Sequence, residues 1–247
     1  MSRFSVIVAA AGSGTRFASG SQKKTYAMLA GDPVWKHSVR RFVNRDDVAE
    51  ILIVVSPEDE AWFAETNREF LQACSASVVA GGSERCESVN NALQKVANGV
   101  EFVAVHDAAR PCVSPEMIER VFAAAKIHGN AVPATPVSST LKRSADGVKV
   151  LGTVDRSELF ESQTPQVFRV NELREANEFL ATVTPTDEAQ LMERMGYTVF
   201  LAEGCALNRK ITSQPDMDFA EAALAIIARV DRGPIHFDGP LDNTKLR

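Results

Sequence analysis

The start of the chain combines a buried strand, small residues and positive charges. Ser5–Arg16 reads Ser-Val-Ile-Val-Ala-Ala-Ala-Gly-Ser-Gly-Thr-Arg, and Lys23–Tyr26 reads Lys-Lys-Thr-Tyr. Small residues let a backbone approach phosphates closely and point its N–H groups at them. Arg16 and Lys24 add positive charges that do not depend on backbone geometry. The pattern predicts a nucleoside-triphosphate site at the end of the first strand.

Two better-known phosphate loops do not fit this segment. A dinucleotide fingerprint needs glycine at position 17, where Phe17 stands. A Walker A loop begun at Gly12 needs the same glycine, and one begun at Gly14 needs glycine in place of Ser19. The loop alone also allows a tight strand-to-helix turn with basic residues on a solvated face.

A carboxylate and a guanidinium follow a second apolar run, in His106–Pro111 (His-Asp-Ala-Ala-Arg-Pro). Asp107 is well placed to hold Mg²⁺, which prefers oxygen ligands and phosphates. Arg110 could orient this carboxylate or bind a phosphate in bidentate fashion. A local Asp–Arg ion pair explains the same residues equally well. We interpret His106 as structural.

A third turn lies in Gly81–Ser88 (Gly-Gly-Ser-Glu-Arg-Cys-Glu-Ser). Its backbone could contact a base edge, and Ser88 could bind a phosphate or ribose oxygen, although an ordinary turn with a helix cap fits almost as well. Arg156 could be a second anion anchor. Lys210 stands in a short β-like stretch, 208–212, where solvation at the surface is the default interpretation.

Composition bounds the class of protein. The chain has 247 residues, of which 45% are hydrophobic and 24% charged, and its net charge is −5. This acidity argues against bulk nucleic-acid binding, and no apolar run approaches the ~20 residues that cross a membrane. The N-terminus resembles neither a signal nor a transit peptide. The cysteines lack metal-ligand spacing and are expected to be free thiols in the cytoplasm; they are Cys74, Cys86, Cys112 and Cys205.

Strand-like and helix-like segments alternate along the chain. After the first strand, strands are expected over 50–56, 77–80, 102–106, 131–134 and 198–201. Helices are expected over 33–45 (with Asp32 as N-cap), 58–72, 84–97, 115–127, 171–181, 186–195 and 216–230. Apolar strands alternating with helices predict a parallel sheet covered on both faces. Ligands of such sheets bind beyond the carboxyl ends of the strands, where the first loop and Asp107 fall.

The segment 137–157 differs from its surroundings. It alternates polar with apolar residues around Asp146-Gly147, which is a strong hairpin signal. An isolated hairpin is marginally stable in water, so this one should pack on something. The residues leave open whether it projects to grip a second subunit or folds back on its own sheet.

The ordered set of motifs resembles the 2-C-methyl-D-erythritol 4-phosphate cytidylyltransferase family, over residues 4–228. The motifs are 10–16 (Ala-Ala-Gly-Ser-Gly-Thr-Arg), Lys24, 81–85 with Ser88, 106–111, 153–156, 164–166, 186–189 and 208–210. That family makes a CDP-alcohol in the non-mevalonate isoprenoid pathway. The resemblance implies an enzyme that transfers a cytidylyl group from CTP to methylerythritol phosphate and releases pyrophosphate.

The expected architecture is an α/β fold with a Rossmann-like, mostly parallel sheet, helices on both faces and a projecting β-hairpin arm. Residues 1–231 would form a single nucleotidyltransferase domain, with the arm at about 137–157 and a polar C-terminal tail at 232–247. The resemblance also implies a homodimer in which the arm reaches the neighbour's site, and it favours that role for the hairpin. Neither nucleic acid nor a membrane is an expected partner.

The resemblance further implies roles for individual residues. CTP would be held by Ala10, Ala11, Gly12, Gly14, Gly82, Ser83 and Ser88. Arg16 and Lys24 would stabilise charge on the α-phosphate, and Asp107 would support the Mg²⁺ that bridges the CTP phosphates. The methylerythritol phosphate would be positioned by Arg156 from the arm and by Lys210, with Asp107, Arg110, Thr140, Thr164 and Thr186 as lesser contacts.

Two positions depart from the family's pattern. The family often has proline where Lys23 stands, so either Lys23 or Lys24 could be the catalytic lysine; we assign Lys24 because it precedes Thr25-Tyr26. The family often has an acidic residue in place of Ser83, which leaves the contact to the base open.

Two other functions compete with this one. Ribitol 5-phosphate is the alternative acceptor, because its cytidylyltransferases resemble this family and share the loop. A nucleotide-sensing protein that binds CTP without turnover is the alternative from another class.

Overall fold

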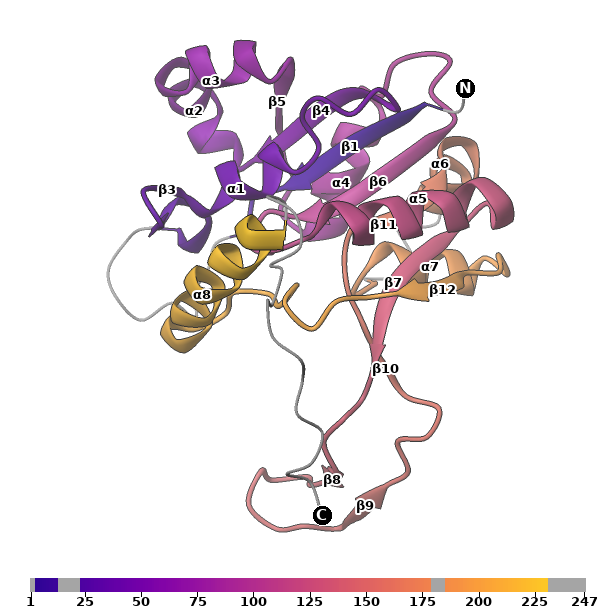
Figure 1. The fold of residues 1–247 in the computed structure, drawn as a ribbon. Helices are drawn as coiled ribbons and strands as arrows, with labels where there is room; N and C mark the ends of the chain where they lie inside the picture. Colours follow the sequence, from indigo (N-terminus) through magenta and orange to yellow (C-terminus); the bar gives the residue numbers. More distant parts are fainter. Residues whose placement is uncertain (1–2, 13–22, 179–184, 231–247) are drawn as a thin grey trace, which may run out of the picture.

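The central sheet has eight strands, most of them parallel (Figure 1). The computed structural model describes residues 3–12, 23–178 and 185–230. The strand order is β10-β7-β11-β6-β1-β4-β5, and β12 pairs with β7. The strands are β1 (Phe4–Ala9), β4 (Val48–Val55), β5 (Ala76–Ala80), β6 (Phe102–Asp107), β7 (Ala131–Pro136), β10 (Phe160–Ser162), β11 (Gln166–Arg169) and β12 (Phe200–Glu203). The predicted α/β fold with a mostly parallel sheet is confirmed.

Helices cover both faces of the sheet because its strands are apolar on both sides. Val6 and Val8 of β1 belong to one core cluster, and Ile7 between them belongs to the other. The first cluster is closed by α1 (Val34–Arg40), α2 (Glu60–Thr66), α3 (Arg68–Ala73) and α5 (Pro115–His128). The second is closed by α4 (Arg85–Leu93), α6 (Val170–Asn177) and α7 (Glu188–Arg194).

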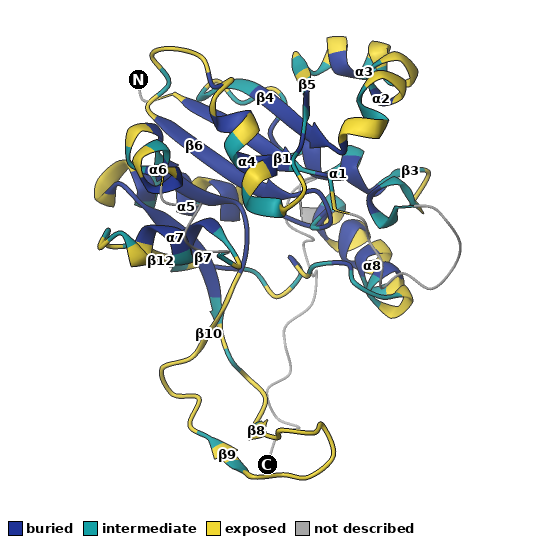
Figure 2. Ribbon diagram, turned by 180° about the vertical axis from the view of Figure 1, so that it is seen from behind, coloured by how far each residue is buried: buried dark blue, intermediate teal, exposed yellow. Residues whose placement is uncertain are grey.

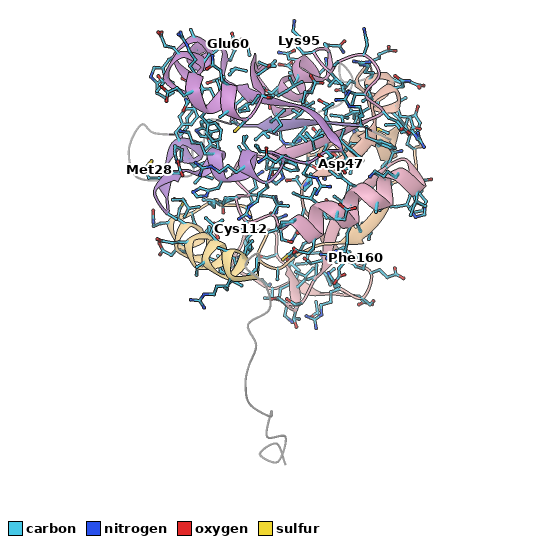
Figure 3. All side chains as sticks on the ribbon, turned by 45° about the horizontal axis from the view of Figure 1, so that its top comes forward. Met28, Asp47, Glu60, Lys95, Cys112 and Phe160 are labelled. Carbon is cyan, nitrogen blue, oxygen red and sulfur yellow. The ribbon has the colours of Figure 1, made fainter. Side chains whose placement is uncertain are left out.

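The last helix, α8 (Gln214–Val230), covers a smaller apolar cluster of its own. Cys112 lies beneath it (Figure 3), and the Sγ–H of this residue donates to the carbonyl of Ala220 at 3.5 Å. In the part of the chain that the structure describes, no helix is long and apolar enough to span a bilayer.

The helix expected over 33–45 is shorter than predicted and is not capped by Asp32. It spans Val34–Arg40, because the preceding residues form a small hairpin of β2 (Met28–Leu29) and β3 (Asp32–Pro33). Ala30 and Gly31 form its turn with φ of 45° and 91°. Two consecutive positive φ values are typical of the tight hairpin turns that match strand twist.

The helix expected over 58–72 is interrupted. A short 3-10 helix, η2 (Pro57–Asp59), is followed by α2 and α3, which meet at Asn67. The Asn67 side chain donates to the carbonyl of Phe63 at 3.0 Å and so competes with helical hydrogen bonding.

Smaller differences concern element ends and two missed strands. α4 ends at Leu93 rather than at 97, and β12 begins two residues later than expected. α6 ends at Asn177, earlier than the helix expected over 171–181, and the tail 232–247 lies outside the described residues. The sequence did not predict β10 or β11. β11 runs antiparallel between β6 and β7, and β10 pairs with β7, the strand from which the arm starts.

The hairpin expected over 137–157 is confirmed as a projecting arm (Figure 1). It contains β8 (Leu141–Arg143) and β9 (Gly152–Val154), and nearly all of it is exposed in this single chain (Figure 2). Its tip is a longer loop than a two-residue turn, because Arg143 pairs with Gly152. Asp146 Oδ1 shapes this loop by accepting from the N–H groups of Val148 and Lys149 at 2.9 and 2.8 Å.

The aromatic packing beneath α5 gives a test of the core. Phe122 is fully buried, and its ring stacks on that of Phe4 with 3.9 Å between centroids. We expect Phe122→Ala to lower the free energy of unfolding by about 3–5 kcal/mol, because the lost contacts leave a cavity. Ile127→Ala, on the same helix but 73% exposed, should change it by less than about 0.5 kcal/mol in the same urea titration. Equal effects of the two substitutions would contradict this account.

Candidate active site

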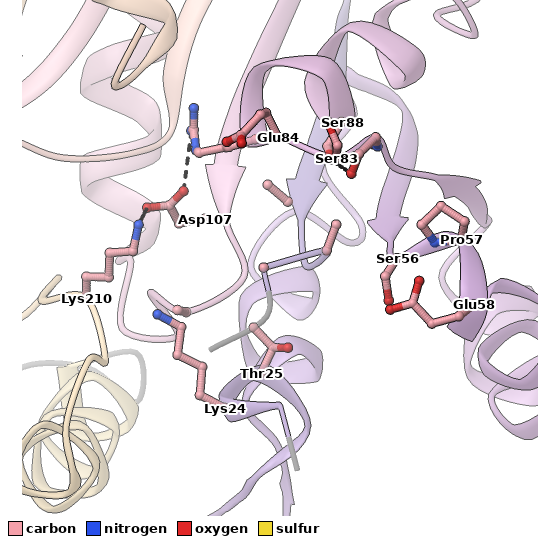
Figure 4. A pocket seen from close by; sticks show the side chains of 16 residues that line it. Lys24, Thr25, Ser56, Pro57, Glu58, Ser83, Glu84, Ser88, Asp107 and Lys210 are labelled. Carbon is pink, nitrogen blue, oxygen red and sulfur yellow. Dashed lines mark hydrogen bonds and ion pairs between the residues drawn. The ribbon is translucent and has the colours of Figure 1, made fainter. Parts of the chain in front are cut away.

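A cavity of about 590 Å³ opens at the carboxyl ends of β1, β4, β5 and β6 (Figure 4). This is where parallel α/β sheets bind their ligands. Its lining residues are Ala9, Ala11, Gly12, Lys24, Thr25, Ser56, Pro57, Glu58, Gly82, Ser83, Glu84, Arg85, Ser88, Asp107, Ala109 and Lys210. Residues far apart in sequence thus share one hollow.

The Gly81-Gly82 turn needs glycine because its surroundings are crowded. A Cβ on Gly81 would lie 2.7 Å from Ser88 Oγ, and one on Gly82 would lie 2.5 Å from the Cβ of Glu87. The N–H of Gly82 donates to Ser88 Oγ at 3.0 Å. The N–H and Oγ–H of Ser83 donate to Glu87 Oε2 at 2.9 and 2.7 Å. Ser83 and Ser88 therefore shape a backbone loop that faces the cavity.

Asp107 is the electrostatic centre of the site. This buried carboxylate lies 2.8 Å from Lys210 Nζ, 3.4 Å from Arg85 Nη2 and 3.6 Å from Arg110 Nε. Burial alone would raise the pKa of Asp107, but the charges of Arg85, Lys210 and Arg110 hold this pKa well below its usual range. Asp107 is therefore ionised at neutral pH. Figure 4 shows the contact between Asp107 and Lys210.

Arg85 and Glu188 are functional candidates that the sequence reasoning missed. Arg85 Nη1 lies 2.6 and 2.9 Å from the two carboxylate oxygens of Glu188, and Nη2 reaches Asp107. Burial opposes the charge of Arg85, yet Glu188 and Asp107 raise its pKa. Both residues stand within quoted motifs, but only the fold reveals that they meet across 103 positions.

The two neighbouring lysines have different surroundings. Lys24 lines the cavity and points into it (Figure 4) from the 3-10 helix η1 (Lys24–Tyr26). Lys23 instead lies 2.7 Å from Asp59 Oδ2 and 3.2 Å from Glu58 Oε1. The geometry favours Lys24 as the residue that meets a ligand.

The first loop is only partly described. Ala11 and Gly12 line the cavity, whereas Ala10 is buried, does not line it, and donates its N–H to the carbonyl of Val54 at 2.8 Å. The predicted contact of Ala10 with CTP therefore lacks a free N–H donor here. Gly14 and Arg16 lie outside the described residues.

Three predicted acceptor contacts do not line the cavity. Arg110 donates from Nη1 to the carbonyl of Asn208 at 2.9 Å. Buried Thr164 accepts from the N–H of Asp107 at 3.0 Å, and Thr186 donates its N–H to Gln190 Oε1 at 2.9 Å beside the start of α7. These contacts make the three residues parts of the frame that supports Asp107 and α7.

Lys210 comes from an irregular segment rather than from the predicted β-like stretch. Residues 208–212 contain no strand, and the segment is anchored by Asn208, which donates to the carbonyl of Thr164 at 2.9 Å, and by Ile211, whose N–H donates to the carbonyl of Ala109 at 2.8 Å. The Lys210 side chain is 39% exposed, but it is more than a solvated surface residue, because its amine pairs with the buried carboxylate of Asp107.

The two candidates on the arm, Thr140 and Arg156, are exposed and do not line the cavity of their own chain. Arg156 therefore needs a site other than the one in its own chain if it is to bind the acceptor.

The surroundings of Asp107 do not fit a metal ion held by the protein. Its oxygens already contact Lys210, Arg85 and Arg110. Within the described ranges, no group of three His, Cys, Asp or Glu residues could hold an ion. We therefore derive no step through a metal bound by Asp107.

Comparisons with known proteins identify the class of this chain. The α/β fold with a mostly parallel sheet is that of a nucleotidyltransferase, and the chain is an enzyme of this class. The family profile described as "IspD: 2-C-methyl-D-erythritol 4-phosphate cytidylyltransferase" matches residues 4–226. The chain belongs to this family.

Individual relatives cover nearly the whole chain. It is 43% identical to the 2-C-methyl-D-erythritol 4-phosphate cytidylyltransferase of Rhodopirellula baltica, over 89% of this chain and 94% of the relative. It is 37% identical to the Bacillus mycoides protein of the same name, over 90% and 98%. The crystal structure of the Thermus thermophilus enzyme superimposes with a TM-score of 0.74 at 32% identity, over 90% of this chain and 98% of that one.

His106 makes stability depend on pH. It is fully buried between Thr164 Oγ1, 3.0 Å from Nδ1, and the carbonyl of Arg110, 3.1 Å from Nε2. Burial lowers its pKa from 6.5 to about 4. As the pH falls, the unfolded state takes up this proton before the folded state does. Neutral His106 therefore contributes fully to the free energy of unfolding above pH 6.5, and this contribution declines as the pH falls towards 4.

We expect the fall in unfolding free energy between pH 7 and pH 4 to be about 3 kcal/mol smaller in His106→Gln than in the unmodified chain. Urea titrations of both proteins at the two pH values measure these falls. Equal falls would contradict the lowered pKa of His106.

Proposed function

We propose that this chain carries out the reaction for which its family is named, using the cavity at the strand ends. A phosphate oxygen of 2-C-methyl-D-erythritol 4-phosphate attacks the α-phosphorus of CTP in line with the leaving group. A P–O bond forms to the acceptor, the bond between the α-phosphorus and the α–β bridging oxygen breaks, and pyrophosphate leaves. The product is 4-diphosphocytidyl-2-C-methyl-D-erythritol, an isoprenoid precursor.

One observation carries the proposal: cations and small-residue loops from separate parts of the chain line a single hollow. Ala11, Gly12 and Gly82 are small residues that line this hollow, and the nucleotide would lie beside them. Lys24 and Lys210 bring positive charge to that hollow, as two anionic reactants require before they can approach each other. Asp107 Oδ2 lies 2.8 Å from Lys210 Nζ and holds this amine in place.

The charged residues would share the chemical work. Lys24 would stabilise the charge that builds on the α-phosphate, together with Arg16. Lys210 would position the acceptor phosphate, while Arg85 and Arg110 keep Asp107 ionised. Mg²⁺ is expected to arrive with the phosphates of CTP, whose charge it would neutralise.

Replacing Lys24 tests the chemical role. We expect Lys24→Ala to lower kcat by about 10² or more, because removal of a preorganised charge donor costs ~3–4 kcal/mol in the transition state. Pyrophosphate release with CTP, Mg²⁺ and the acceptor measures this, and a melting curve checks that folding survives. An unimpaired variant would reject the role of Lys24.

Two further outcomes separate the competing functions. A higher kcat/KM with ribitol 5-phosphate than with methylerythritol phosphate would change the acceptor but keep the enzyme class. Binding of CTP without pyrophosphate release at any acceptor concentration would indicate a nucleotide sensor instead.

We also propose a homodimer formed through the arm. Val148, Val150 and Leu151 of the arm are 88%, 57% and 59% exposed, an apolar surface that a hairpin with three-residue strands cannot cover by itself. A second copy would cover it, and Arg156 would enter the neighbour's cavity.

Mixing two inactive variants tests this arrangement. If Lys24 and Arg156 act in one site from different chains, then Lys24→Ala and Arg156→Ala recover activity after mixing and subunit exchange. Half of the dimers are then mixed, and each contains one intact site, so about a quarter of the original activity should return. No recovery, despite exchange shown by mass labelling, would contradict the shared site.

A further inference from the structure

We propose that Lys23 and Asp59 form a clamp that positions Lys24 in the cavity, an inference that rests on the proposed function of Lys24. Both would be positioning residues, because they would act on the ligand only through Lys24. Asp59 in particular lies outside every motif that the sequence analysis singled out.

The contacts of Asp59 enclose the short segment that carries Lys24. Asp59 Oδ2 accepts from Lys23 Nζ at 2.7 Å and from the Tyr26 hydroxyl at 2.9 Å. These two donors stand directly before and two residues after Lys24. The N–H of Tyr26 donates to the carbonyl of Lys23 at 2.9 Å and closes the turn. One carboxylate oxygen thus fixes both ends of η1.

The anchor of the clamp belongs to the sheet rather than to the loop. Ser56 follows β4 directly; its Oγ accepts a hydrogen bond from Lys23 Nζ and donates one to Asp59 Oδ2 at 3.0 Å. The Tyr26 ring packs against Trp62 and Phe63 of α2, with 5.8 Å between centroids in each case. The position of Lys24 is therefore set relative to the end of β4 and to α2.

A second carboxylate, that of Glu58, also lies beside the ammonium group of Lys23. Glu58 lines the cavity, and its Oε1 lies 3.2 Å from Lys23 Nζ. An unopposed pair of carboxylates at this position would repel a polyphosphate. Burial alone would lower the pKa of Lys23, but the hydrogen bonds that it donates to Asp59 and Glu58 raise this pKa above its ordinary value. Lys23 therefore stays charged beside its partners at neutral pH.

This pair differs from an ordinary surface ion pair. The side chains of Lys23 and Asp59 are only 19% and 22% exposed, and several donors converge on one oxygen. Exposed ion pairs contribute little to stability, whereas networks with fixed geometry hold side chains in place.

The chain offers a matched control pair in Arg45 and Asp47, whose side chains are 19% and 20% exposed and lie 2.9 Å apart. Asp47 directly precedes β4, and its backbone carbonyl accepts from the N–H of Phe4 at the opposite end of β1 from the cavity.

The experiment compares Lys23→Met, Asp59→Asn and their double variant with Lys23→Arg and Asp47→Asn. Pyrophosphate release gives kcat and both KM values, and hydrogen exchange of peptide 23–29 reports on the clamp without turnover. We expect each single clamp variant to lower kcat about tenfold, with the acceptor KM within about twofold, and the double variant to match the worse single. Lys23→Arg should stay within about threefold of the unmodified enzyme and Asp47→Asn within about twofold.

Exchange in peptide 23–29 should be faster in Asp59→Asn than in Asp47→Asn. If Lys23→Met does not fold, Asp59→Asn carries both readouts. Clamp variants that behave like Asp47→Asn in rate and in exchange would overturn the proposal, as would multiplicative losses in the double variant. If the unmodified chain releases no pyrophosphate, the proposed function fails, and hydrogen exchange still decides whether the clamp exists.

Discussion

The site depends on a buried negative charge, the carboxylate of Asp107 at the end of β6. Taking a carboxylate out of water is expensive unless cations and hydrogen-bond donors surround it. Arg85, Arg110 and Lys210 meet this requirement from three separate segments. Because each cation must reach the same carboxylate, their segments are held together by charge as well as by apolar packing.

The consequences extend beyond the first contacts. Arg85 also binds Glu188, so the start of α4 and the start of α7 are held together beside β6. Asn208 fixes the segment of Lys210 against the carbonyl of Thr164, and Thr164 itself accepts the N–H of Asp107. The frame of the cavity is therefore one connected polar network with a charged centre.

Much of this fold could be predicted from the sequence because local patterns decide it. The apolar runs of β1, β4 and β6 are buried on both faces, and they stand out without any knowledge of the fold. Gly82 and Asp107 fall just beyond or at strand ends, where parallel sheets place ligands. The Asp146-Gly147 signal located the arm correctly.

The failures have a common physical cause, which is dependence on distant partners. β10 and β11 are short, and they exist because β6 and β7 offer them hydrogen bonds. The ion pair of Arg85 with Glu188 joins residues that share no local pattern. Lys23 and Lys24 are adjacent and chemically identical, yet Lys23 pairs with Asp59 and Glu58 from a distant segment while Lys24 lines the cavity.

The strand order places different features on the two flanks of the sheet. One flank, β1-β4-β5, presents the backbone loops, while β7, β10, β11 and β12 on the other flank carry the arm. Insertions or deletions in the arm change the second flank without touching the first. Such a scaffold allows the arm to vary in length and sequence while the loops that line the cavity keep their places, because β6 lies between the two flanks.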